Sequence, residues 1–184
     1  MSAQPNPTSA VVIDKQFLLA VLQESRELFL NSFAGVTEEQ SRLKPALDQW
    51  SVLDTIEHLT TAETIQLKLI STQRTARTAD APNREYAFLQ MIPNRTHKME
   101  SPEGARPTGR FATLAAATEQ SKTTRAGVIR FLEQYTDDLR ASEVKHPHPA
   151  AGMVSICEML VAMAMHAKRH AAQIEEIRKT LRLG

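Results

Sequence analysis

The sequence is poor in cysteine, glycine and aromatic residues. Its single cysteine, Cys157, cannot form a disulfide within the chain, as is usual for proteins of reducing compartments. Aromatic residues make up only 5% of the chain and there are six glycines, whereas Ala, Leu, Glu, Gln and Arg are frequent. This composition favours helices over strands, so we expect an all-α fold.

The sequence also lacks a strong net charge and a long apolar run. The 22 Lys and Arg residues nearly balance the 21 Asp and Glu residues, giving a net charge of +1. This balance offers no basic field of the kind that binds nucleic acids or anionic membranes. No apolar run approaches the roughly 20 residues of a membrane-spanning helix, and MSAQPNPTSA at the start lacks a signal-peptide pattern. We therefore expect a cytoplasmic protein that binds neither nucleic acid nor membranes.

Apolar residues recur with helical periodicity in four segments of the chain. The length of 184 residues suits one domain, which we place at 11–184 after a flexible N-terminus at 1–10. The helical periodicity covers residues 14–35, 51–70, 113–135 and 155 to the C-terminus. Gly35 is expected to end the first of these helices. The sequence therefore predicts a four-helix bundle.

Local signals define where two of these helices begin and what separates the others. Ser51 with Asp54 and Ser155 with Glu158 have the spacing of capping boxes. TEEQSRL at 37–43 is expected to be a polar turn. Between 71 and 110 four prolines and two glycines exclude a long helix. A long connection should therefore join helices two and three, either crossing the bundle or lining a site, and the direction of the third helix stays open.

The sequence HAKRH at 166–170 places two histidines on one face of the last helix. At a spacing of four residues their rings are neighbours and can share one metal ion. The pair continues the apolar stripe of Met159 and Met163, so both rings should face the interior, where an unpaired imidazole is costly. His58, in the middle of the second helix, could supply a third ligand. The alternative is that these are buried histidines bonded to side chains or water.

Three sequence patterns carry a resemblance to a known family. The patterns are W-S-x-x-D-x-x-x-H-L in the second helix, H-P-x-x-G before the last helix, and H-x-x-R-H-x-x-Q-I within it. They resemble the DinB-like (DinB/YfiT) superfamily of metalloenzymes, and together they span most of the chain. The matching residues are Trp50, Ser51, Asp54, His58, Leu59, His148, Pro149, Gly152, His166, Arg169, His170, Gln173 and Ile174.

The resemblance implies a four-helix bundle, often a homodimer, that holds one divalent ion through three histidines. In this chain those ligands are His58, His166 and His170. Zinc and nickel are the metals we expect, although such a ligand set accepts other transition metals. Relatives include thiol S-transferases and isomerases that use a low-molecular-weight thiol, so such a thiol is a further expected co-substrate.

A metal ion on three neutral histidines would give the chain one of two activities. It could activate water for hydrolysis of a small molecule or a thiol for S-transfer. The alternative from another class is a non-catalytic, metal-binding stress-response bundle that acts through its surface or a dimer interface. An open site beside a pocket would favour the enzyme, and a sealed site a structural ion.

Several neighbouring side chains are candidates for supporting roles. Glu57 and Glu63 flank His58 and could act as general base or accept a hydrogen bond from a ligand ring, although helix glutamates are usually solvated. Gln173 could bond a ligand ring or serve only helix packing. Trp50 should anchor the start of the second helix, with an N–H that could reach a ligand.

The remaining polar candidates are expected to lie outside the metal site. Arg169 is off the histidine face and should form a surface or inter-subunit ion pair. Cys157 is too far along its helix to share the ion and should be a small buried residue. His146 and His148 alternate in an extended segment, so their rings should point apart, and His148 could line the mouth of a pocket. His97 should be an exposed loop residue.

Overall fold

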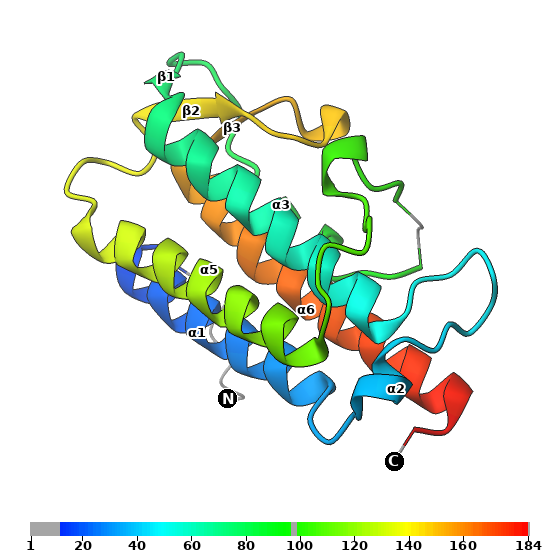
Figure 1. Cartoon of the computed structure of the whole chain (residues 1–184). Helices are drawn as coiled ribbons and strands as arrows, with labels where there is room; N and C mark the ends of the chain where they lie inside the picture. The colour runs from blue at the N-terminus through cyan, green and yellow to red at the C-terminus, as the bar shows by residue number, and fades with distance from the viewer. Residues whose placement is uncertain (1–11, 97–98, 184) are drawn as a thin grey trace, which may run out of the picture.

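Four long helices pack side by side and form the body of the molecule (Figure 1). The computed structural model describes residues 12–96 and 99–183. The long helices are α1 (Lys15–Ser32), α3 (Val52–Thr72), α5 (Leu114–Gln134) and α6 (Ile156–Leu181). The predicted four-helix bundle is confirmed. Within the described ranges, no helix is both long enough and apolar enough to cross a membrane.

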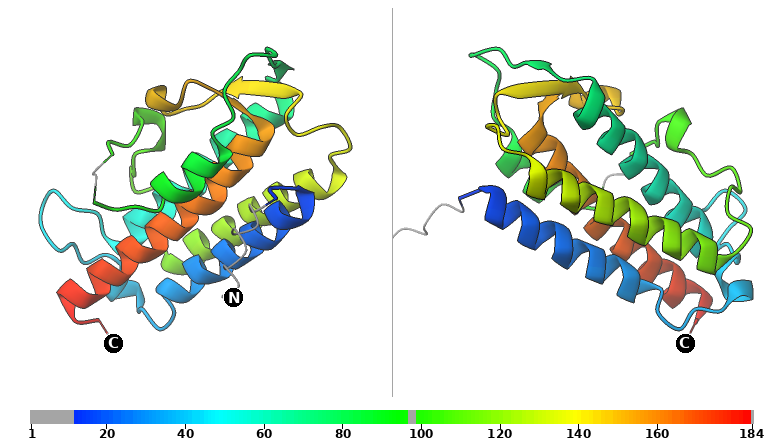
Figure 2. Two further views of the ribbon diagram at one scale, coloured as in Figure 1. Left: turned by 180° about the vertical axis from the view of Figure 1, so that it is seen from behind. Right: turned by 60° about the vertical axis from the view of Figure 1, so that its left-hand side comes forward.

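The long connection crosses the bundle, so that α3 and α5 run in the same direction (Figures 1 and 2). Lys15 at the start of α1 donates from Nζ to the carbonyl oxygen of Glu133 at the end of α5 (2.8 Å). The N–H of Leu114 at the start of α5 donates to Oε2 of Glu38, which follows α1 (2.6 Å). These two bonds make α1 antiparallel to α5, which settles the direction of α5. Contacts of Lys168 with Glu24 and of Arg178 with Ser32 show that α6 runs in the direction of α1.

Local capping chemistry fixes where the helices begin. The capping boxes of Ser51 with Asp54 and of Ser155 with Glu158 are both formed, as their spacing predicts. The prediction for Gly35 is wrong in detail, because α1 ends at Ser32. Gly35 has a φ of 80°. Its freedom to adopt positive φ therefore serves the turn after α1 and not the helix end.

Two predicted loop segments contain short helices. Residues 37–43 were expected to form a polar turn, but Thr37 and Gln40 form a capping box that begins α2 (Glu38–Ser41). The long connection holds α4 (Glu85–Met91) and a 3-10 turn, η1 (Glu103–Ala105). Both α4 and η1 are short, in agreement with the prolines between 82 and 107.

A small three-stranded antiparallel sheet, which the sequence did not predict, accompanies the helices. Its strands are β1 (Thr75–Ala76), β2 (Ser142–Lys145) and β3 (Met153–Ser155), in the order β1-β2-β3. The second 3-10 turn, η2 (Pro149–Ala151), separates β2 from β3. Val144 and Val154 face each other across β2 and β3, and both are buried. The sheet thereby ties the end of α3 to the beginning of α6.

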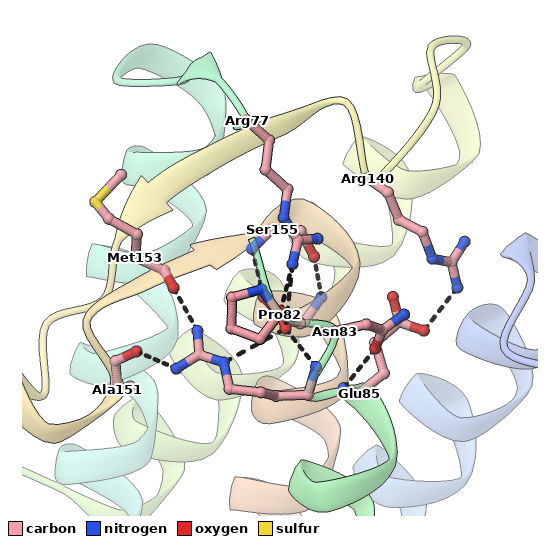
Figure 3. Close-up of polar contacts among 10 residues, drawn as sticks. Arg77, Pro82, Asn83, Glu85, Arg140, Ala151, Met153 and Ser155 are labelled. Atoms are coloured by element: carbon pink, nitrogen blue, oxygen red, sulfur yellow. Dashed lines mark hydrogen bonds and ion pairs between the residues drawn. The ribbon is translucent and has the colours of Figure 1, made fainter. Parts of the chain in front are cut away.

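A charged cluster holds the long connection against the start of α6 (Figure 3). Glu158 is fully buried, and its Oε1 accepts from the N–H of Arg84 (2.7 Å). The guanidinium of Arg84 donates in turn to the carbonyl oxygens of Ala151 (2.7 Å) and Met153. These bonds satisfy a buried carboxylate and fix one end of the connection over the sheet.

The core consists of two apolar clusters with a polar layer between them. One cluster includes Leu22 and Leu132, and the other includes Phe29 and Ile56. Between them the buried Arg125 guanidinium forms an ion pair with Glu63 and donates to Oγ of Ser25 (3.2 Å). This layer joins α1, α3 and α5 through side chains that are 3% exposed or less. A slip of one helix along the others would leave one of these buried charges unpaired, which is costly.

Candidate metal centre

The three predicted histidines meet where α3 and α6 pack against each other. His58 comes from α3, and His166 and His170 lie one turn apart on α6. Nε2 of His166 is 3.3 Å from Nε2 of His58 and 2.8 Å from Nε2 of His170. Among the described residues, one ring nitrogen of each histidine lies within 4.8 Å of the other two, a group that could hold a metal ion.

Hydrogen bonds on the outer side of two rings determine which nitrogen carries the proton. Nδ1 of His58 lies 2.8 Å from the carbonyl oxygen of Ala105 and must donate, because a carbonyl oxygen only accepts. Nδ1 of His170 lies 2.9 Å from Oε1 of Gln173, which also accepts from Arg95. In the neutral rings Nε2 is therefore unprotonated and directs its lone pair toward the other histidines.

This donor set fits a divalent transition-metal ion. Three imidazole nitrogens converge, and two of the rings are nearly removed from water, since His58 is 4% and His170 5% exposed, whereas His166 is partly buried. Converging lone pairs repel one another unless a cation or a proton lies between them. Three histidines are a ligand set that zinc and related ions accept, with further positions left for a substrate or water. The residues present thus fit the ion that the sequence predicts.

Burial keeps the three rings neutral and so available as ligands. The pKa values of His166 and His170 lie well below the usual range, chiefly because of burial and then because of neighbouring histidines. The pKa of His58 is also lowered by burial, and its bond to Ala105 partly opposes this. A neutral imidazole can bind a metal without first releasing a proton.

Comparison with known proteins agrees with this fold. A family model described as the DinB superfamily matches residues 22–174. The chain belongs to the DinB superfamily. It is 21% identical to the protein YuaE of Bacillus subtilis (strain 168) over 165 residues, which are 89% of this chain and 98% of YuaE. The resemblance read from the sequence is therefore confirmed.

Two solved structures share the fold of this DinB chain. YfiT from Bacillus subtilis, described as a probable metal-dependent hydrolase with an unusual four-helix bundle topology, superposes with a TM-score of 0.63. The two are 17% identical, over 99% of this chain and 95% of YfiT. A conserved protein from Enterococcus faecalis superposes with a TM-score of 0.61 at 16% identity, over 92% of this chain and 98% of that one. At these identities the likeness shows the fold.

Trp50 covers one side of the histidine cluster. Its ring centroid lies 4.7 Å from that of His58 and 6.3 Å from that of His170. The residue directly precedes the Ser51 cap of α3, so the start of that helix fixes its position. The half-buried indole shields the rings of His58 and His170 from water while part of it stays accessible.

Glu57 is buried and bonds the long connection, so it is not the solvated helix glutamate that was one alternative to a general base or a hydrogen-bond acceptor beside His58. Its carboxylate is 2% exposed and accepts from the backbone N–H groups of Thr108 (2.7 Å), Gly109 (3.1 Å) and Arg110 (3.0 Å). Glu57 therefore anchors the end of the connection, whose Ala105 carbonyl oxygen bonds to His58 on α3. Its acceptor sites are occupied by these bonds, which leaves it poorly suited to act as a base.

Glu63 belongs to the polar layer of the core and not to the histidine cluster. It is 2% exposed and bonded to Arg125, with Nε to Oε2 at 3.1 Å. Burial raises the pKa of its carboxyl group, and the charge of Arg125 opposes that shift. The candidate role for Glu63 beside the metal site is not supported by this position. Its partner lies 62 residues away in the sequence, so the spacing gave no sign of the pair.

Gln173 and Arg169 support the site in different ways. Gln173 accepts from His170, the position expected of a residue that orients a ligand ring. Arg169 was expected at the surface, but it is buried and only 8% exposed. It donates from Nη1 to the carbonyl oxygens of Ile92 (3.3 Å) and Asn94 within the connection. Both residues thus fasten the connection to the histidine-bearing part of α6.

The two histidines before α6 have different partners, and His146 is the one that bonds to a helix of the bundle. Its Nε2 lies 3.2 Å from the carboxamide of Gln66 on α3. His148 uses Nδ1 to accept from the N–H of Ala150 within its own turn (3.2 Å). The structure thus places His148 as the cap of η2, whereas we expected it at a pocket mouth.

The free energy of unfolding of the metal-free protein should decrease as the pH is lowered, because His146 has a lower pKa in the folded chain than in the unfolded chain. Burial lowers the pKa of His146 to about 4 from 6.5. Below about pH 6.5 the unfolded chain binds a proton that the folded chain does not, so stability is lost as the pH falls toward 4, by about 3 kcal/mol at most. Urea unfolding across that window should show a shallower slope for His146→Gln. A variant slope equal to that of the parent would contradict the assignment.

Two remaining predictions concern Cys157 and His97. Cys157 is fully buried, as expected, and burial raises the pKa of its thiol, with further contributions from Glu85. A thiol so placed is a packing residue and a poor nucleophile. His97 lies outside the described residues.

Sequence reasoning missed Arg95, Ala105 and Gln66. Arg95 forms an ion pair with Glu176 (2.6 Å) and reaches Gln173, and Ala105 offers only a backbone carbonyl. Both lie in the connection, where no periodicity indicates a partner. Gln66 follows His58 by two helical turns, a spacing that could have marked it as facing the same side.

Proposed function

We propose that this DinB-superfamily chain is a divalent-metal-dependent hydrolase of a small-molecule substrate. The observation that carries the proposal is the convergence of three histidine Nε2 atoms, two of which belong to rings whose outer Nδ1 atoms are fixed by hydrogen bonds. A purely structural role for His58 and His170 would not require these lone pairs to face one another. The likeness to YfiT, which is described as a probable metal-dependent hydrolase, supports the same conclusion.

The residues of the chain would prepare the site in three ways. His58, His166 and His170 would hold the ion, which would supply Lewis-acid chemistry and lower the pKa of a bound water molecule toward about 7. Ala105 and Gln173 keep two ligand rings in the tautomer that leaves Nε2 free. Trp50 limits access of bulk water from one side, which strengthens electrostatic interactions within the site.

Neither flanking glutamate supports proton transfer in this proposal. Glu57 is engaged by three backbone N–H groups and Glu63 by a buried arginine. Activation of the nucleophile would therefore rest on the three histidines and the ion that they hold. The S-transfer to or from a low-molecular-weight thiol and the homodimer, both implied by the family resemblance, stay predictions.

Turnover before and after metal removal tests the proposed function. The protein is stripped with a chelator, reloaded with zinc, nickel or manganese, and assayed on a panel of activated esters and small amides. A parallel arm adds a low-molecular-weight thiol with an electrophilic acceptor. We expect hydrolysis that requires metal and disappears in His170→Ala, whose circular dichroism spectrum should stay that of a folded bundle.

The other outcomes separate the competing activities. Metal-dependent thiol consumption without hydrolysis would replace the hydrolase by an S-transferase. Stoichiometric metal binding with no turnover in either arm would favour the non-catalytic bundle. Hydrolysis that survives in His170→Ala would contradict the proposed site.

A further inference from the structure

One of the three clustered histidines, His166, has no hydrogen-bond partner for its Nδ1 atom among the described residues. Nδ1 of His58 and Nδ1 of His170 each have an acceptor, but Nδ1 of His166 is buried and has no hydrogen-bonding partner among the described residues. Ligating histidines almost always donate this second N–H, because the bond fixes the tautomer and the ring orientation. The Nδ1–H of His166 should therefore reach its hydrogen-bond partner indirectly.

Gln66 presents a second buried polar group without a partner. The side chain is 4% exposed, and one end of its carboxamide makes no hydrogen bond with the described residues. The other end lies 3.2 Å from Nε2 of His146. Buried polar groups in native proteins are nearly always bonded to protein or to internal water.

The orientation of the carboxamide follows from the tautomer of His146. The N–H of His148 donates to Nδ1 of His146 (3.0 Å), so the proton of the neutral ring is on Nε2. Nε2 therefore donates to Gln66, and the carboxamide oxygen must take this bond, since its nitrogen cannot accept. The amide N–H group is then the end that is left without a partner.

The fold brings Gln66 and His166 toward each other. The sheet joins the end of α3 to the start of α6, so the two helices are antiparallel (Figure 1). Gln66 lies about 12 Å beyond His58 along α3, and helix side chains lean toward the N-terminus of their own helix. The side chain of Gln66 therefore tilts along α3 toward His58, and the side chain of His166 tilts along α6 in the opposite direction, toward Gln66. His146, which contacts Gln66, is also near enough to His166 to contribute to the lowering of its pKa.

We propose that Gln66 is the positioning residue of His166 and acts through one internal water molecule. The water oxygen accepts from the Nδ1–H of the ring and from the amide N–H of Gln66, which satisfies both buried donors. His146 holds the carboxamide in place from its other end. Each of the three ligand rings would then be oriented by its own partner. This inference rests on the proposed function, since it assigns a role toward the same metal ion.

The affinity for metal, measured apart from catalysis, tests the role of Gln66. Zinc affinity is measured by competition with a chelator in the parent, Gln66→Leu and Gln66→Glu. We expect Gln66→Leu to bind zinc about 10- to 100-fold more weakly, as for other residues that orient a ligand. Gln66→Glu should regain most of the affinity, because a carboxylate can also accept the imidazole N–H directly or through water. Gln173→Leu is the reference for a visible ring partner, and Gln23→Leu, on the exposed face of α1, is the matched control.

A second readout reports on the geometry of the site. The visible absorption spectrum of the Co²⁺-loaded protein depends on how the three rings are oriented, so it should change in Gln66→Leu and stay unchanged in Gln23→Leu. Urea unfolding of the metal-free variants shows whether the bundle still folds. If Gln66→Leu does not fold, His146→Phe, which removes the bond that holds the carboxamide, should weaken zinc binding in the same direction.

The outcomes separate this inference from the proposed function. A folded Gln66→Leu or His146→Phe variant with the affinity and Co²⁺ spectrum of the parent would overturn the role of Gln66 and leave the metal site intact. A parent protein that takes up no metal would remove the proposed function and this inference together.

Discussion

Replacing Arg125 by methionine is expected to lower the free energy of unfolding by about 3–5 kcal/mol, because it leaves the buried Glu63 carboxylate without its partner. Both side chains of the pair are 3% exposed, so water cannot take over the role of the guanidinium. The pKa of Glu63 is already raised by burial, and losing Arg125 removes the interaction that opposes this shift. Urea denaturation followed by circular dichroism at neutral pH measures the loss.

The double variant Glu63→Leu with Arg125→Met provides the control. Replacing both partners by apolar residues of similar size is often neutral or stabilising, so it should recover most or all of the lost stability. The single replacement Glu63→Leu should be as damaging as the change at Arg125. If either single variant costs less than about 1 kcal/mol, the value typical of exposed pairs, the pair is not buried as described.

Zinc is expected to stabilise the parent protein strongly. An ion that binds only the folded chain adds about 3 kcal/mol of stability when its free concentration is a hundred times the dissociation constant. The three Nε2 atoms come from two helices that separate on unfolding, so the unfolded chain cannot offer the same site. Urea unfolding with and without zinc should show this increase in the parent and none in His170→Ala.

A histidine outside the cluster distinguishes this effect from non-specific binding. His148 caps its own turn before α6, so His148→Ala should keep the full response to zinc. Each response is measured against the metal-free form of the same variant, so that the loss of the His170 hydrogen bonds does not enter the comparison. An equal response to zinc in the parent and in His170→Ala would contradict the site.

Features encoded by neighbouring residues were predictable from the sequence. The boxes of Ser51 with Asp54 and Ser155 with Glu158 form because each needs only residues three positions apart. The pair in HAKRH shares a face because helical geometry dictates it, and its position within an apolar stripe indicated burial. The four-helix bundle was predictable because these capping boxes and the helical periodicity of apolar residues together mark all four long helices.

Features that depend on distant partners could not be read in advance. Strands of two to four residues leave no detectable periodicity, so the small sheet was missed. Glu57 and Glu63 appeared to be ordinary helix glutamates because their partners lie more than 45 residues away. Arg169 was misplaced for the same reason, since it donates to backbone carbonyls of the connection. The connection supplies hydrogen-bonding partners to side chains of both α3 and α6 next to the histidine cluster.

Elemental analysis of the purified protein, prepared without a histidine tag, tests the central claim most directly. It is run on the parent beside His58→Ala and His170→Ala, with and without prior exposure to zinc and nickel. We predict about one transition-metal ion per chain in the parent and a loss of that ion in both variants. A folded parent that holds no metal and takes up neither zinc nor nickel would contradict the account.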